Sequence, residues 1–148
     1  MRHLLLALHL VVAIFAVGPL VGAATTASRA VRLRDADGMA AAAKTIRRYA
    51  YASILVPILG MGLVQSKWNF SFSQTWIWLS LLLYLAAVAL ALAVLVPALT
   101  RAPSVLAGGQ ASASGASDGL SARIAASGGL IAVLFVVIVF LMVYKPGR

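Results

Sequence analysis

The sequence has 148 residues, of which 63% are hydrophobic and 10% are charged. Soluble domains carry about a quarter of charged residues, so this composition, with a mean hydropathy of +1.02, argues against a soluble protein and predicts one integral membrane domain over residues 1–148. The net charge of +9 does not predict a nucleic-acid partner, because membrane proteins concentrate basic residues at the membrane edge. Cys is absent, which excludes disulfides, thiolate metal sites and lipidation on Cys.

The first apolar run extends from Leu4 to about Ala24 and follows Arg2, as in a secretory signal with a cleavage site at 21–23. The run exceeds the usual signal core of about 7–15 residues, so we expect an uncleaved transmembrane helix near 4–34. Pro19 should bend this helix, because its ring displaces the bond to the carbonyl of Phe15.

A basic segment at 28–48 should form the turn of a helical hairpin, with Asp37 as the cap of a second helix near 38–65. The apolar part of that helix, 49–65, contains Pro57. The fragment from Asp35 to Gly38 lacks the other ligands of a calcium loop, so a plain turn is favoured. Its basic residues are candidates for contact with anionic lipids or with an acidic partner surface: Arg29, Arg32, Arg34, Lys44, Arg47 and Arg48.

The segment from Trp76 to Leu99 has no charged residue and would span about 36 Å as a helix. That length covers a hydrocarbon core of about 30 Å, and a third helix is expected near 75–100. Trp68, Trp76 and Trp78 cluster at its start and are expected to anchor it at the membrane interface.

An Ala/Gly/Ser-rich stretch at 102–120 predicts a flexible connector, followed by a fourth helix near 119–144 capped by Asp118 or Ser121. The predicted fold is therefore all-α, an integral membrane four-helix bundle with up-down-up-down topology. Small residues let helix backbones approach closely, and those expected at helix contacts are Gly60, Gly62, Ala86, Gly128 and Gly129.

Orientation follows from the positions of the basic residues. Most of them fall in the two connectors on one side, including Arg101 and Arg123. Cytoplasmic loops carry the excess of Lys and Arg, so both termini are expected outside the plasma membrane and the 28–48 loop in the cytoplasm. The basic residues that remain on the opposite side are Arg2, Lys67, Lys145 and Arg148.

The chemistry available to the chain is sparse. His3 and His9 lie on one predicted helix about 120° apart, so the chain alone does not supply a two-histidine haem site; a single ligand from His9, completed by a partner chain, remains an alternative. Between the membrane interfaces the four spans contain no charged residue, and the chain contains no Glu, which argues against proton relays and general acid–base catalysis. We therefore expect no enzyme activity and assign no catalytic, cofactor-binding or metal-binding residue.

The segment Leu8-His9-Leu10, the basic pair Arg47-Arg48 and the exit Val96–Ala98 resemble small four-helix membrane proteins of high-GC bacteria. In that group a Trp and paired glycines follow the histidine, whereas Val, Ala and Phe occupy those positions here. In size and type the chain is also similar to the accessory subunits of actinobacterial cytochrome bcc–aa3 respiratory supercomplexes, which hold no cofactor.

That resemblance implies a non-catalytic accessory subunit of a larger membrane complex, with anionic lipids as further partners. The alternative is a small carrier or channel, or a protein that binds haem or metal through His9. The lack of charge inside the spans favours the accessory subunit.

Overall fold

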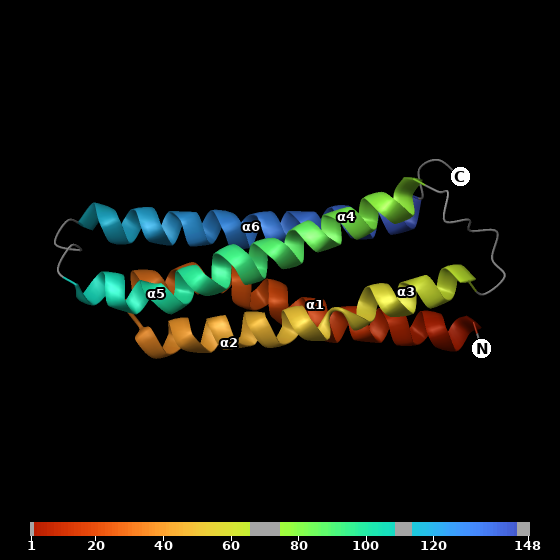
Figure 1. Cartoon of the computed structure of the whole chain (residues 1–148), viewed down its shortest axis with the longest axis horizontal. Helices are drawn as coiled ribbons and strands as arrows, with labels where there is room; N and C mark the ends of the chain where they lie inside the picture. Colours follow the sequence, from red (N-terminus) through yellow and green to blue (C-terminus); the bar gives the residue numbers. More distant parts are fainter. Residues whose placement is uncertain (1, 66–74, 109–113, 145–148) are drawn as a thin grey trace.

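The computed structural model describes residues 2–65, 75–108 and 114–144, and every regular element in these ranges is helical (Figure 1). Long helical rods lie side by side, and the start of α1 lies at the same end of the bundle as the end of α6. The elements are α1 (Arg2–Arg32), α2 (Ala36–Ala52), α3 (Leu55–Gln65), α4 (Thr75–Ala89), the π-helix η1 (Leu90–Leu95), α5 (Val96–Ala107) and α6 (Ser114–Tyr144). The predicted all-α class is confirmed.

Within the described residues, three helical stretches are long and apolar enough to cross a membrane: His3–Arg32, Thr75–Ala107 and Asp118–Tyr144. Large apolar side chains cover their outer faces, among them Phe15, which is 70% exposed, and Val139, which is 59% exposed. Soluble monomers rarely expose large continuous apolar surfaces. Lipid is the solvent that fits these faces, because its hydrocarbon chains are as apolar as the side chains.

In the hairpin between α1 and α2, the N-cap of α2 lies two residues earlier than predicted. Asp35, not Asp37, is the N-cap of α2, and its carboxylate accepts a hydrogen bond of 2.9 Å from the backbone N–H of Gly38. Asp37 lies in the first turn, where its negative charge favours the positive end of the helix. Arg34 makes the tight turn with a φ of 53°.

The predicted continuous helix at 38–65 is wrong, because the chain breaks between α2 and α3 at Ser53 and Ile54. Pro57 has no N–H and cannot bond to the carbonyl of Ser53, four residues earlier. That carbonyl instead accepts a bond of 2.9 Å from the N–H of Val56. With 11 residues, α3 is about 16 Å long, too short to cross a membrane by itself.

Helical structure also extends further than predicted on both sides of the 102–120 connector. Helix α5 continues to Ala107, and α6 begins at Ser114 rather than near 119, so Asp118 and Ser121 lie inside the helix and do not cap it. Ser121 Oγ donates to the carbonyl of Asp118 at 3.0 Å. Alanine is the strongest helix former, and in this stretch it outweighs the glycines. Residues 109–113 lie outside the described part of the chain.

The path of the third rod sets the shape of the bundle. Helix α4 packs mainly on α6, whereas α5 packs mainly on α2, so the rod α4–η1–α5 crosses from one side of the bundle to the other (Figure 1). The Val96 N–H bonds to the carbonyl of Ala91, five residues earlier, which is the π-helical spacing that widens a turn. Pro97 follows directly and cannot donate a backbone bond. Together they account for the change of partner along the rod.

The core is a seam of small and branched residues. On α6 the buried positions are spaced by four and three residues in turn, as in a coiled coil, and α1 has the same spacing from Leu20 to Val31. The seam residues on α6 are Ile124, Gly128, Ile131, Phe135 and Ile138.

Candidate functional site

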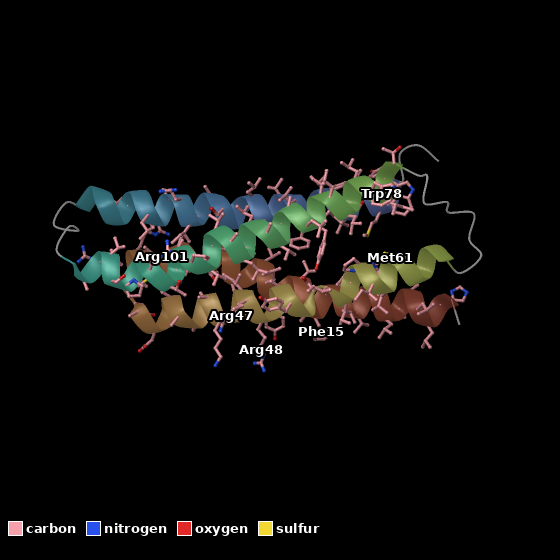
Figure 2. All side chains as sticks on the ribbon, viewed as in Figure 1. Phe15, Arg47, Arg48, Met61, Trp78 and Arg101 are labelled. Carbon is pink, nitrogen blue, oxygen red and sulfur yellow. The ribbon has the colours of Figure 1, made fainter. Side chains whose placement is uncertain are left out.

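Two features carry the polar chemistry of the described residues: a basic end of the bundle and a polar interior. At the basic end, α1 and α5 finish and α2 and α6 begin. All the basic side chains there are exposed, and Arg47 and Arg48 project away from the bundle (Figure 2). We call the following residues the basic end, although Arg47 and Arg48 lie farther from the hairpin, near the middle of the bundle (Figure 2): Arg29, Arg32, Arg34, Lys44, Arg47, Arg48, Arg101 and Arg123.

The capped hairpin positions part of this basic end. A Cβ added to Gly38 would overlap the carboxylate of Asp35, so glycine at this position leaves the capping carboxylate its room. A small hollow of about 240 Å³ lies beside the hairpin and is lined by Arg29 together with Asp35. The opposite charges on its wall make it a poor site for either an anion or a cation.

The polar interior is centred on the break between α2 and α3. The hydroxyl groups of Tyr84 and Ser53 lie 2.9 Å apart, and both side chains are buried. Ser53 Oγ donates to the carbonyl of Ala50 at 2.8 Å, so the Tyr84 hydroxyl is the donor to Ser53 Oγ. The Tyr84 ring meets Phe135 edge-on at a centroid distance of 6.3 Å. These contacts join α4 and α6 to the break between α2 and α3.

His9 lies on α1 in the same region and is 7% exposed. Its imidazole interacts with the backbone of Val56, and its Cε1 would lie 3.4 Å from a Cβ built on Gly60. Nδ1 has no hydrogen-bond partner in the structure, and neither does the buried Oγ of Ser80. The glycine thus gives the imidazole room between α1 and α3.

Metal-ligating side chains do not gather among the described residues. No group of three His, Cys, Asp or Glu side chains lies together among them. The Ser53 hydroxyl is bonded to a tyrosine hydroxyl and a carbonyl, and neither group is a base that would activate it as a nucleophile. What these hydrogen bonds can do is hold the helices together around the break between α2 and α3.

The residues predicted at helix contacts divide into two groups. Gly128 meets the backbone of α1 at Ala24, and Gly60 meets His9, whereas a Cβ on Gly62 or Gly129 would touch nothing within 4 Å. Ala86 is exposed and points out of the bundle, where it shares one face with the exposed Ala89.

The tryptophans also separate. Trp76 is 8% exposed and lies within the bundle, and Trp78 is 59% exposed and points outward (Figure 2). Trp68 lies outside the described residues. An outward Trp at a helix start is the arrangement expected of an interface anchor.

Sequence reasoning missed the seam between α1 and α6. The alternating spacing of four and three residues, with Ala24 facing Gly128, is visible in the sequence once helix boundaries are known. Sequence reasoning also used Arg101 and Arg123 only for orientation, although the structure places both on the wall of one groove between α5 and α6.

A family model described as "Predicted integral membrane protein (DUF2269)" matches residues 3–146. No curated protein matches the chain, and no solved structure matches it.

Proposed function

We propose that this chain, which belongs to the family of predicted integral membrane proteins DUF2269, is a non-catalytic accessory subunit of a larger membrane complex. The proposed complex belongs to the respiratory chain, as in the cytochrome bcc–aa3 supercomplexes whose accessory subunits the chain resembles. The subunit acts by helix packing and lipid contact in the plasma membrane.

The observation that carries this proposal is the outward face of α4. Ala86 and Ala89 are exposed on this face and are spaced by three residues, so they form a short smooth stripe along the helix. In membranes there is no hydrophobic driving force between helices, so their association depends on close packing. Small residues favour it because they let two helix backbones approach closely. The stripe faces away from the chain's own core, so a helix of another subunit is its natural partner.

The first prediction tests this partner. The tagged chain, extracted from its native membrane in mild detergent, is expected to co-purify haem-containing subunits, measured by reduced-minus-oxidised haem spectra and by mass spectrometry. Replacing Ala86 and Ala89 with Leu should reduce the recovered haem about tenfold, because a bulky stripe holds the partner backbone at a distance. Ala7→Leu, at an exposed alanine of α1, is the matched control and should leave the recovery unchanged.

Two results would contradict the accessory role: a clean homo-oligomer without haem, or equal recovery from the stripe variant and its control. The same preparation also tests the alternative that His9 binds haem. We propose a packing role for His9, so His9→Gln should keep every haem equivalent, since Gln retains a donor and an acceptor. Loss of one haem equivalent would identify His9 as a ligand and make the chain an electron-transfer component.

We further propose that α2 and α3 together supply a fourth span, completing an up-down-up-down bundle. From Tyr49 to Gln65 the chain is apolar and about 25 Å long as a helix, near the lower limit for crossing a bilayer. The broken helix can cross because the Ser53–Tyr84 hydrogen bond and the Val56–Ser53 bond satisfy groups at the break. Both termini then lie outside, and the basic end faces the cytoplasm.

The second prediction tests this topology with single cysteines, which suit a chain without native Cys. Ala36→Cys should resist a membrane-impermeant maleimide in intact cells and react after the cells are opened. Asn69→Cys should react in intact cells. The reverse pattern would place the basic end outside, and reaction of both cysteines in intact cells would show that α2 and α3 do not cross.

A further inference from the structure

We propose that the groove between α5 and α6 binds one anionic phospholipid, with its phosphate at Arg101 and Arg123 and the first part of one acyl chain along the apolar wall. The groove has a volume of about 520 Å³, within the range of about 300–1,000 Å³ typical of small-molecule sites. Such a lipid would bind whether or not the chain is an accessory subunit.

The groove exists because α5 leaves α6. Past η1 and Pro97, α5 packs on α2 and makes little contact with α6, and the two helices are separated at this end of the bundle (Figure 1). Some of the facing residues are small, with Ala93 and Ala98 on one wall and Ala126 on the other, while the buried Leu95 and Ile124 also line the groove. The small residues leave the space between the two walls unfilled.

The groove has basic side chains near the end of the bundle and apolar ones deeper, which matches the headgroup and acyl chain of a phospholipid. On the wall formed by η1 and α5, Arg101 is the lining residue closest to the end of the bundle, and Ala93 in η1 lies about 12 Å deeper along the rod. Arg123 stands on the opposite wall, and no acidic side chain is among the described residues that line the groove. Two guanidinium groups can hold a phosphate through several charge-assisted hydrogen bonds.

The open side of the groove favours a lipid over a soluble anion. The three spanning stretches expose apolar side chains to the bilayer, and the deep part of the groove is continuous with that apolar surface through the exposed Val94. Basic pockets between transmembrane helices on the cytoplasmic side are known to receive phospholipid headgroups. Arg47 and Arg48, by contrast, project from the bundle without a facing wall (Figure 2).

The test uses the full chain in detergent and counts bound phospholipid by native mass spectrometry as phosphatidylglycerol is titrated. The unaltered chain is expected to retain one lipid. Arg101→Gln and Arg123→Gln should each weaken its binding about fivefold, and the double variant about 30-fold, given the usual contribution of a basic residue near anionic headgroups. Arg47→Gln with Arg48→Gln is the matched charge control: although these arginines are candidates for contact with anionic lipids at the open surface, they do not line the groove, so this variant should retain the groove lipid.

A second pair of variants tests the apolar wall without changing charge. Ala126→Leu fills the groove from an exposed position and should weaken lipid binding at least fivefold, whereas Ala125→Leu, exposed on the same helix but outside the groove, should not. Thermal unfolding in neutral detergent checks that all variants are folded. Equal binding by the groove variants and their controls would overturn the proposal. So would full displacement of the lipid by inorganic phosphate alone, or an arginine-dependent adduct with the mass of a peptide.

Discussion

Gly128→Ala is expected to lower the free energy of unfolding by about 1–3 kcal/mol, the usual cost of inserting a group into a well-packed core. A Cβ on Gly128 would overlap the carbonyl oxygen of Ala24 and lie 2.7 Å from the carbonyl carbon and 3.2 Å from the N–H nitrogen of Thr25. These are backbone atoms, so no side-chain rotation can make room. Helices α1 and α6, the most extensively packed pair in the bundle, would have to move apart.

Gly129→Ala is the matched control, because a Cβ there meets nothing within 4 Å. Alanine has a better helix propensity than glycine, so this variant should be stabilised by up to about 1 kcal/mol. Reversible unfolding of both variants in mixed micelles, followed by circular dichroism against increasing SDS, measures the difference. Equal midpoints for the two variants would mean that α1 and α6 do not cross at Ala24.

The existence of the membrane helices was easier to predict from the sequence than their limits. Long apolar segments predict membrane helices by composition alone, and the stretch that contains Trp76 to Leu99 lies within one of the three spans. The predicted first and last residues of the helices were less accurate, because each depends on one or two hydrogen bonds. Asp35 rather than Asp37 takes the cap, and Pro57 interrupts a helix that apolar character alone would continue.

The candidate sites were predictable only in part, because they depend on which helices meet. The basic residues are evident in the sequence, but the pairing of Arg101 with Arg123 across one groove requires α5 to turn away from α6. The turn comes from a π-helix, which has no simple sequence signature. Similarly, Gly128, which meets α1, can be told from the neighbouring Gly129, whose added Cβ would meet nothing within 4 Å, only once the helix boundaries and the spacing of the seam are known.

The second large effect is expected for Leu20→Ala, which should cost about 2 kcal/mol of unfolding free energy. Leu20 is 0% exposed and belongs to the central apolar cluster. In soluble proteins such truncations cost about 2–5 kcal/mol, from lost transfer energy together with the cavity that remains. In a membrane the first part is small, because lipid is as apolar as leucine. The cavity part remains, which places the expected cost at the lower end of that range.

Leu10→Ala on the same helix separates these two parts. Leu10 is 53% exposed, so lipid or detergent chains can fill the space left by its side chain, and no cavity forms. Its unfolding free energy, measured by the same SDS titration, should lie within about 0.5 kcal/mol of the unaltered chain, as for ordinary surface substitutions. A cost for Leu10→Ala equal to that for Leu20→Ala would show that protein, not lipid, covers this face of α1. Unchanged stability in Leu20→Ala would contradict the position of Leu20 in the core, because a cavity sealed by protein on every side has no solvent to fill it.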